Sequence, residues 1–273
     1  MSDCQMGIII PSFQDSRIAH TILSIVMLDT TNLTRIYILD GGSPEELLRM
    51  MRGLLRPQDI LVSERDKGIF DALNKGIDIV TEPYFGWLGS DDFFTSAVNF
   101  SEIVERFETA ELDCVIFGTA FIDDFKVRRR TPAHLPTKGN YTVGRFVPHF
   151  SSFWRTATIG SRRFNLDYPS SSDQDFFLGL VLAQRLRSHC SPEVGTIQRL
   201  GGASTGGAKR VLRANLDTFG IYRRHMGLVR GLLGVGSKLA SKLIPRPLAA
   251  RLPITKDLTD AMITASVLNA STK

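Results

Sequence analysis

Short apolar runs alternate with amphipathic segments through the first 120 residues, and this alternation limits the fold more than any other feature of the sequence. The runs typical of buried strands lie at residues 6–13, 35–40, 59–64, 84–88 and 113–123. Helical patterns mark segments 16–28, 43–55, 70–80 and 98–111. Strands that alternate with helices predict right-handed βαβ units. We therefore expect an α/β fold whose central sheet is mostly parallel and flanked by helices.

Two of the predicted helices begin with a specific signal. Ser43 and Glu46 have the spacing of a capping box, so we expect Ser43 to cap the helix at 43–55. The segment 173–186 opens with acidic residues, which suit the positive end of a helix dipole. Between the two, residues 123–148 are polar and contain three prolines, which predicts a long loop or a hairpin.

Polar side chains follow each of the first four predicted strands. In chain order they are Ser12, Asp15, Asp40, Glu64, Asp66, Asp91 and Asp92. Open α/β sheets bind ligands at the carboxyl ends of their strands, so this set predicts a site. The pair Asp91–Asp92 by itself would also fit a turn or a helix N-cap. Beside Asp40 and Asp66, however, the pair creates electrostatic repulsion between carboxylates at one edge of the sheet. A divalent cation bound to a nucleotide diphosphate would relieve this repulsion. Mg²⁺ and Mn²⁺ prefer carboxylate oxygens as ligands.

Several other kinds of site find no support in the sequence. The first strand is followed by PSFQDS, which contains neither the GxGxxG of a dinucleotide-binding turn nor a P-loop. The near match GGASTGGAK lies late in the chain and puts Lys209 out of register. Three widely spaced cysteines and five histidines without ligand spacing predict neither a zinc site nor a disulfide framework. The net charge of +5 suits anionic ligands in general; we expect no nucleic-acid partner and a cytoplasmic location.

Four segments between residues 7 and 95 resemble family 2 glycosyltransferases of the GT-A fold. PSFQDS is similar to the opening strand and loop of that family, and ILDGGS to its second strand and turn. SERDKGIFDALNKGI is similar to its Ser-Glu-x-Asp-x-Gly stretch. LGSDDFF resembles its metal-binding DxD element, with Ser90 in place of the leading carboxylate. The resemblance implies a GT-A fold that binds a nucleotide sugar.

The resemblance also implies roles for individual residues on the donor side. The implied nucleotide-sugar-binding residues are Pro11, Ser12, Phe13, Asp15, Asp40, Asp66, Lys67, Asn74, Ser90 and Asp91. Within this set Asp40 would accept a hydrogen bond from the base. Asp92 would hold the divalent metal, Mn²⁺ or Mg²⁺. The simpler alternative for Asn74 is a solvated position on a helix surface.

The segment VPHFSSFW and the acidic start of the helix SDQDFFLGL resemble the acceptor side of the same family. Inverting transfer needs a general base for the acceptor hydroxyl, and a carboxylate is the expected one. The resemblance implies Asp173 as this base, with Asp175 as the alternative; both would also serve simply as helix-capping residues. His149 would contact the acceptor or a phosphate, or have a structural role.

The implied activity is that of an inverting glycosyltransferase of the hexosyltransferase type, using a UDP-, GDP- or dTDP-sugar. The acceptor would be a sugar or a lipid-linked saccharide, in the synthesis of a bacterial surface polysaccharide such as lipopolysaccharide, capsule or exopolysaccharide. Two alternatives remain open. One is a non-catalytic nucleotide- or sugar-binding module of the same fold. The other is a nucleotidyltransferase, which would carry a Gly-rich, Arg-containing loop after the first strand, unlike PSFQDSR.

We expect a catalytic domain over residues 1–215, divided into a donor half at 1–97 and an acceptor half at 98–215. Residues 216–273 would form a helical, basic and amphipathic extension. Within it, residues 226–246 place leucines on one stripe and basic residues off it. This stripe would either contact the inner face of the cytoplasmic membrane peripherally or pack on protein, including a second copy in a homo-oligomer.

Overall fold

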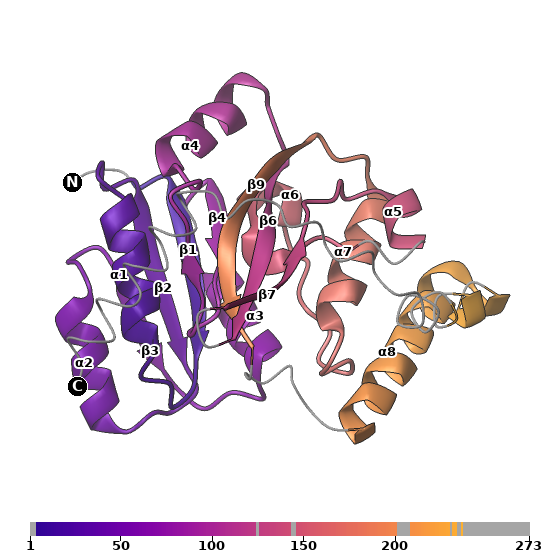
Figure 1. Ribbon diagram of the computed structural model, residues 1–273, viewed down its shortest axis with the longest axis horizontal. Coiled ribbons are helices and arrows are strands. Elements are labelled where there is room, and N and C mark those ends of the chain that lie inside the picture. The colour runs from indigo at the N-terminus through magenta and orange to yellow at the C-terminus, as the bar shows by residue number, and fades with distance from the viewer. Residues whose placement is uncertain are drawn as a thin grey trace.

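The computed structural model describes residues 4–123, 126–142, 146–200, 208–229, 231–233 and 236. Within these residues a curved, nine-stranded sheet forms the centre, with helices on both of its faces (Figure 1). The strand order is β3-β2-β1-β4-β8-β6-β9-β5, and β7 pairs with β6 alone. The structure therefore confirms a central sheet flanked by helices.

The first half of the sheet is parallel, as the sequence predicts. Its strands are β1 (Met6–Ser12), β2 (Thr34–Asp40), β3 (Ile60–Ser63) and β4 (Tyr84–Trp87). The helices between them are α1 (Ile18–Leu28), α2 (Glu45–Leu54) and α3 (Ile69–Ile79). In the register of this half, Ser12 pairs with Asp40 and Asp40 pairs with Ser63. The carboxyl ends of these strands thus lie level with one another.

The second half of the sheet is mixed. After β5 (Phe93–Phe94) and α4 (Phe100–Thr109), the chain forms the hairpin of β6 (Cys114–Asp123) and β7 (Lys126–Thr131). The short helices α5 (Lys138–Thr142) and η1 (His149–Ser151) lead to β8 (Ser152–Arg155) and α6 (Thr156–Ile159). The last elements are α7 (Ser172–Ala183), β9 (Ser188–Arg199) and α8 (Ala208–Met226). Because β8 runs antiparallel to both β4 and β6, it joins the two halves into one sheet.

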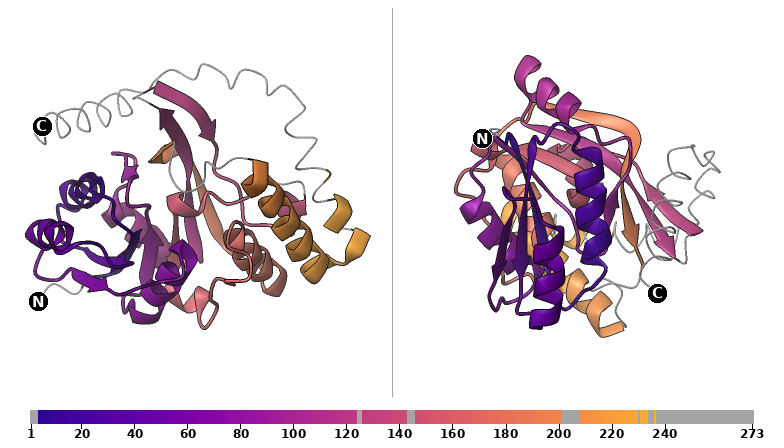
Figure 2. Two further views of the ribbon diagram at one scale, coloured as in Figure 1. Left: turned by 90° about the horizontal axis from the view of Figure 1, so that it is seen from below. Right: turned by 90° about the vertical axis from the view of Figure 1, so that its left-hand side faces the viewer.

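Alternate side chains of the first strands divide the core into two layers. Ile8 and Ile10 of β1 pack with α1, α2 and α4 on one face of the sheet. Ile9, between them, packs with α3 and α7 on the other face, together with Ile221 of α8. This period of two is what a strand buried on both faces produces, and it explains the continuous apolar run of β1. Figure 2 shows the two helical layers on either side of the sheet.

One local prediction is wrong, because Ser43 does not cap α2. The N-cap residue is Pro44, and no side chain accepts a hydrogen bond there. The Ser43 hydroxyl instead donates to Asp40 Oδ1 at 2.5 Å and accepts from the backbone N–H of Gln14 at 2.9 Å. The charged Asp40 carboxylate is a strong acceptor for the hydroxyl proton, and the hydroxyl oxygen accepts from Gln14 instead of from an N–H group of α2.

The C-terminal extension is described only in part. The helix predicted there is present as α8, which begins before residue 216 and lies beside α7 (Figure 1). After it, residues 228, 229 and 231–233 are also helical and form a short helical segment. Residues 230, 234, 235 and 237–273, which include most of the predicted stripe at 226–246, lie outside the described residues. No helix in the described part of the chain is both long enough and apolar enough to cross a membrane.

Candidate functional site

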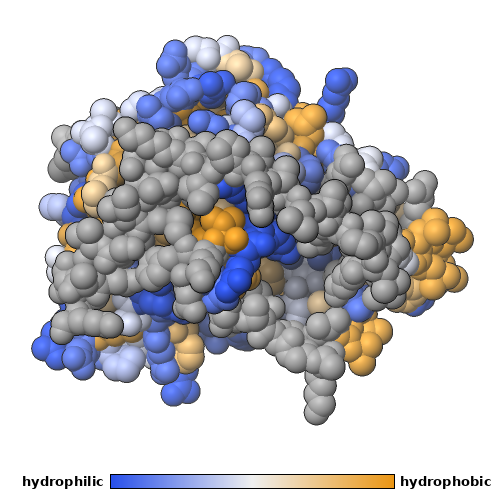
Figure 3. All heavy atoms as spheres, viewed as in Figure 1, coloured by the Kyte–Doolittle hydropathy of each residue, from blue (hydrophilic) through white to orange (hydrophobic). Residues whose placement is uncertain are grey.

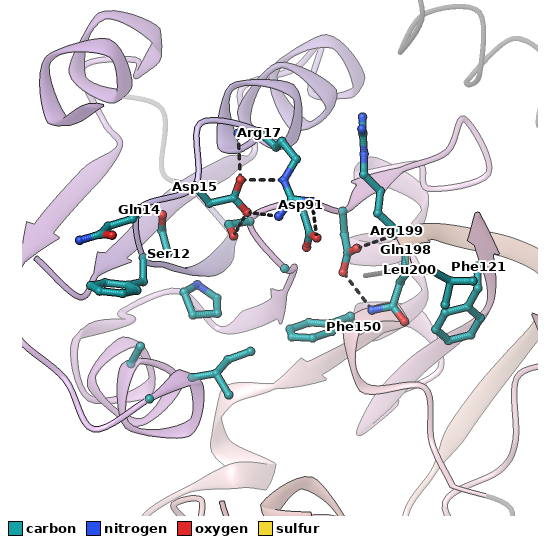
Figure 4. A pocket seen from close by; sticks show the side chains of 18 of the residues that line it. Ser12, Gln14, Asp15, Arg17, Asp91, Phe121, Phe150, Gln198, Arg199 and Leu200 are labelled. Atoms are coloured by element: carbon teal, nitrogen blue, oxygen red, sulfur yellow. Dashed lines mark hydrogen bonds and ion pairs between the residues drawn. The ribbon is translucent and has the colours of Figure 1, made fainter. Parts of the chain in front are cut away.

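A cavity of about 910 Å³ lies at the carboxyl ends of β1 and β4, beside the end of β9 (Figure 4). Eight of the residues implied on the donor side line it: Pro11, Ser12, Phe13, Asp15, Asp66, Ser90, Asp91 and Asp92. The structure therefore brings together residues that are up to 81 positions apart in the sequence. Asp40, Lys67 and Asn74 do not line this cavity, and neither do His149, Asp173 and Asp175.

Arg17 joins the loop after β1 to the loop after β4. Its guanidinium binds both carboxylate oxygens of Asp15, at 2.8 and 3.0 Å, and lies 3.2 Å from Asp91 Oδ2. The Ser90 hydroxyl donates to the second oxygen of Asp15 at 3.0 Å. Burial raises the pKa of Asp91, and the charge of Arg17 opposes this effect. Figure 4 shows Arg17 between the two carboxylates, so the two loops are fixed relative to each other before any ligand binds.

Asp92 is held by the end of β9. Its Oδ2 accepts from the Gln198 side chain at 2.9 Å, and its Oδ1 accepts from the backbone N–H of Arg199 at 3.2 Å. The residue is 4% exposed. Burial and the neighbouring charge of Asp91 raise the pKa of Asp92 to about 7. Gly89 permits this packing, because a Cβ there would lie 2.6 Å from the Asp92 carboxylate.

The opposite end of the cavity is formed by Ser12, Phe13 and Asp66. The Ser12 hydroxyl is buried and has no hydrogen-bond partner among the described residues. Phe13 is 61% exposed although it lines the cavity. An exposed aromatic ring of this kind can stack on a planar ligand group. Asp66 and Phe13 both close over Gly41, where a Cβ would lie 2.7 Å from the Asp66 carboxylate. Glycine at this turn therefore makes room for two side chains of the cavity wall.

Asp40 has its hydrogen-bonding capacity used inside the protein. Its carboxylate accepts from the N–H groups of Gly42 and Ser43 and from the hydroxyls of Ser43 and Ser63, at 2.5 to 3.0 Å. Burial by itself would raise the pKa of Asp40, but these four hydrogen bonds outweigh it and lower the pKa. Asp40 thus shapes the Gly-Gly-Ser turn, and the base-binding role that the family resemblance implies remains a prediction.

Two other residues implied on the donor side lie outside the cavity. Lys67 is exposed, and its backbone N–H donates to Asp71 at the start of α3. The Asn74 side chain donates to the Phe164 carbonyl at 2.9 Å and accepts from the Phe164 N–H at 2.7 Å. This pair of bonds ties α3 to the second half of the chain, so Asn74 is not a solvated surface residue.

On the acceptor side, His149 and Asp173 lie together. His149 Nδ1 is 3.6 Å from Asp173 Oδ2. The His149 ring packs 4.1 Å from the ring of Phe150, which is itself part of the cavity wall. Burial lowers the pKa of His149, and Asp173 opposes this effect only in part. The His149 carbonyl accepts from the Trp87 indole N–H, which fixes η1 against β4.

Asp175 faces away from this cluster. Its carboxylate pairs with His225 Nε2 of α8 at 2.8 Å, and both residues line a separate groove on the far side of α7. The side chain of Asp173 is 26% exposed and that of Asp175 is 11% exposed. The geometry therefore separates two carboxylates that the sequence leaves as alternatives.

Some lining residues were not singled out from the sequence. They are Gln14, Arg17, Phe121, Arg129, Phe150, Gln198, Arg199 and Leu200. Arg199 lies beside the carboxylates, and its Nε and Nη2 atoms are buried without a partner among the described residues. Burial lowers the pKa of Arg199, and the like charge of Arg17 adds to this. Arg129 stacks over the Phe121 ring at 4.0 Å. The only sequence signal for Gln198 and Arg199 would have been their position at the end of a strand.

The oxygen atoms at Asp91 and Asp92 fit a hard divalent cation. Within the described residues, no group of three or more His, Cys, Asp and Glu side chains could hold a metal by itself. Mg²⁺ does not require one, since one or two carboxylates bind it together with substrate phosphates and water. Each oxygen of Asp92 accepts a single hydrogen bond and keeps a second lone pair. Burial is the main cause of the raised pKa of Asp92, and a cation bound at the carboxylate would lower it.

The fold is that of the GT-A glycosyltransferases, as comparison with solved structures shows. The structure of S. aureus TarS 1–349 in complex with UDP-GlcNAc matches with a TM-score of 0.63 and 12% identity, over 96% of this chain and 81% of that one. The mannosyltransferase PcManGT from Pyrobaculum calidifontis, in complex with GDP-Man and Mn²⁺, matches with a TM-score of 0.59 and 12% identity. This match covers 100% of the present chain and 89% of the mannosyltransferase.

Residues 7–174 match the sequence profile of glycosyl transferase family 2, and the chain belongs to this family. A PGL/p-HBAD biosynthesis glycosyltransferase of Mycobacterium tuberculosis is 24% identical over 180 residues, which are 64% of this chain and 69% of the relative. The predictions of the family, of the GT-A fold and of a transferase are thereby confirmed.

Proposed function

We propose that the protein is an inverting, metal-dependent hexosyltransferase that uses a nucleoside diphosphate sugar as donor. The observation that carries the proposal is the cavity itself, in which an unpartnered Ser12 hydroxyl and the Asp91–Asp92 pair lie at adjacent strand ends. A nucleotide would lie along this edge, with its base near Phe13 and its diphosphate near Asp92. The structures of TarS with UDP-GlcNAc and of PcManGT with GDP-Man support a nucleotide sugar as the donor.

The charges of the cavity favour a diphosphate accompanied by a cation. Arg17 and Arg199 bring positive charge to the same edge as the carboxylates of Asp15, Asp91 and Asp92. Among the described residues, the buried Nε and Nη2 donors of Arg199 have no partner, and a bound anion would accept their hydrogen bonds. When bound at Asp92, Mn²⁺ or Mg²⁺ supplies further positive charge for the departing diphosphate.

Asp173 is the general base in this proposal. Its carboxylate is partly exposed, and its one ion-pairing partner among the described residues is His149, at 3.6 Å. It therefore retains lone pairs that can accept the proton of an acceptor hydroxyl. Asp175 is less suitable, because the bond to His225 occupies it on the far side of α7.

The transfer is a single in-line displacement. Asp173 accepts the proton of the acceptor hydroxyl as the acceptor oxygen bonds to the anomeric carbon of the sugar. On the opposite face, the bond from that carbon to the diphosphate oxygen breaks, and the nucleoside diphosphate carries the electron pair away. Ser12, Asp66 and Arg199 hold the nucleotide in place, which converts binding energy into alignment of the reacting atoms.

The acceptor would be a sugar or a lipid-linked saccharide, and the product part of a bacterial surface polysaccharide. The mycobacterial relative is named as a glycosyltransferase of PGL/p-HBAD biosynthesis, which supports glycosyl transfer in a biosynthetic pathway in general terms. A reaction in the cytoplasm, where nucleotide sugars are made, fits the three cysteines, which are all free thiols.

The proposal is tested by incubating the protein with UDP-, GDP- and dTDP-sugars and Mn²⁺ and analysing the products. Slow release of a nucleoside diphosphate from one donor, abolished in Asp92→Asn, is the expected result. Release of pyrophosphate from a nucleoside triphosphate and a sugar phosphate would instead identify a nucleotidyltransferase. Tight donor binding without any turnover, even with a broad panel of acceptors, would identify a binding module.

A further inference from the structure

Six large apolar residues on α8 and on the short helix after it face solvent. They are Leu212 (61% exposed), Leu216 (58%), Leu228 (57%), Val229 (69%), Leu232 (61%) and Leu233 (60%). Met27 on α1 is similarly exposed, at 59%. Figure 3 shows apolar side chains at the right-hand edge of the molecule, over the end of α8 and the segment that follows.

The exposed residues form one surface. Leu212, Leu216 and Phe219 lie three or four positions apart and therefore share a face of α8. Gly227, with a φ of +87°, ends α8 and lets the chain turn back. Gly231 then packs so close to Phe219 that a Cβ on it would lie 3.2 Å from the ring. Leu232 and Leu233 are thus placed next to the face of α8 that carries Leu216.

The charge around this surface is of one sign. The described residues 218–229, 231–233 and 236 contain no Asp or Glu, and their Arg and Lys residues are Arg223 and Arg224. Arg223 and Arg224 are exposed at the end of α8. Within the described part of the chain, neither of them lies at ion-pairing distance from a carboxylate. The apolar surface is therefore bordered by uncompensated positive charge.

We propose that this surface binds the headgroup region of an anionic lipid bilayer. Leucine and valine side chains enter the boundary between headgroups and acyl chains, while arginines bind lipid phosphates. A second copy of the chain fits less well, because a twofold contact would bring Arg223 and Arg224 of both copies together. The remaining segment at 237–256 is equally basic and would meet the same repulsion.

Side-chain hydrogen bonds connect α8, which carries part of this surface, to the start of α7, which carries the proposed general base. Thr218 of α8 bonds to Gln174 of α7 at 3.1 Å, and His225 pairs with Asp175. Both partners lie in the first turn of α7, next to Asp173. If the proposed function holds, α8 on a bilayer keeps Asp173 close to the lipid surface, where a lipid-linked acceptor would be presented. Lipid binding itself does not depend on that function.

The test is flotation of the full chain with vesicles of phosphatidylcholine, with and without phosphatidylglycerol. The wild type is expected to float with the anionic vesicles and to be released by salt. Leu232→Asn/Leu233→Asn should weaken the binding about tenfold or more, since each leucine contributes buried apolar area. Arg223→Gln/Arg224→Gln should weaken it by a similar factor through lost electrostatic attraction. Met27→Asn, at an equally exposed position on α1, is the matched control and should leave the binding unchanged.

Two results would overturn the proposal. One is equal flotation of the wild type and both double variants, or none at all, with all proteins folded by circular dichroism. The other is a dimer of the wild type, measured by light scattering, that Leu232→Asn/Leu233→Asn converts to a monomer without any vesicle binding. Glycosyl transfer to a water-soluble acceptor should remain within about twofold in these variants, which separates loss of lipid binding from failure of the proposed function.

Discussion

The donor edge and the acceptor edge hold their carboxylates in different ways. At the donor edge, Asp15 and Asp91 share Arg17, and both oxygens of Asp92 are bonded to the end of β9. At the proposed acceptor edge, the start of α7, Asp173 has one ion-pairing partner among the described residues, His149 at 3.6 Å. The carboxylates of the first edge are thus fixed by hydrogen bonds before any ligand binds, and that of Asp173 is less constrained, as the proposed general base requires. Substitutions at the two edges should therefore fail in different ways.

The largest effect is expected from Asp173→Asn. An amide cannot accept the proton, so turnover should fall by about 10³-fold while donor affinity and melting temperature change little. Transfer kinetics and calorimetric titration with the nucleoside diphosphate measure the two quantities separately. Normal turnover in this variant would remove Asp173 from the mechanism.

Asp92→Asn should impair binding of the metal and the nucleotide at the donor edge and leave the proposed general base unchanged. Turnover with Mn²⁺ should fall by about 10²-fold or more, because the diphosphate loses charge stabilisation as it leaves. Unlike Asp173→Asn, this variant should also lose the strengthening of nucleotide binding by Mn²⁺. Titration of the nucleotide with and without the metal checks this, with Asp91→Asn as the companion variant.

The raised pKa of Asp92 should also make the free energy of unfolding depend on pH. Its pKa in the folded protein is about 7, above the value of an unfolded aspartate, so the folded state holds the proton more tightly. Its contribution to the free energy of unfolding is therefore complete below about pH 4 and is lost as the pH rises toward 7, by up to about 4 kcal/mol in total. Thermal melting from pH 4 to 8 should show this decline in the metal-free wild type and a weaker one in Asp92→Asn.

Arg17→Gln should loosen the donor edge without destroying it. Asp15 and Asp91 would lose their shared cation, which should raise the donor KM by about tenfold and cost about 1 kcal/mol of stability, since the pair is partly exposed. Steady-state kinetics and denaturant unfolding measure the two effects. Arg17→Lys retains the charge without the bidentate geometry and should fall between the wild type and Arg17→Gln.

The smallest catalytic effect is expected from Asp175→Asn. Loss of the charged hydrogen bond to His225 should lower the free energy of unfolding by about 1–2 kcal/mol and leave turnover within about threefold of the wild type. Abolished turnover here, combined with an active Asp173→Asn, would exchange the roles of the two carboxylates.

The sequence predicted the donor edge because its residues follow apolar strands in regular order. Ser12, Asp66, Asp91 and Asp92 each stand directly after such a run, and parallel strands bring those positions to one edge. Asp40 stands at an equivalent place, yet its side chain turns inward to bind the turn that follows. Pattern alone gives the position of a strand end and not the direction of its side chain.

The part contributed by β9 was not predictable from local pattern. This strand contains Pro192 and Gly195, residues that weaken any strand signal. Gly195 sits where a Cβ would lie 2.5 Å from Phe117, at an irregular register between β9 and β6. Gln198 and Arg199 therefore reach the cavity through the pairing of β9 with β6, a long-range contact that local sequence patterns do not predict.

The choice between Asp173 and Asp175 also needed tertiary structure. Residues two apart on a helix point about 200° away from each other, so only one of them can face the acceptor. Which one does so depends on where α8 packs, and the pairing of Asp175 with His225 supports the proposal of Asp173 as the base.

The most direct test of the central claim is calorimetric titration of the wild type and Asp92→Asn with UDP, GDP and dTDP, with and without Mn²⁺. The site predicts that one nucleoside diphosphate binds the wild type about tenfold or more tightly when Mn²⁺ is present, and that this gain disappears in Asp92→Asn. Failure of all three nucleotides to bind, or an equal gain from Mn²⁺ in the variant, would contradict the assignment of a donor site to the cavity between β1 and β4.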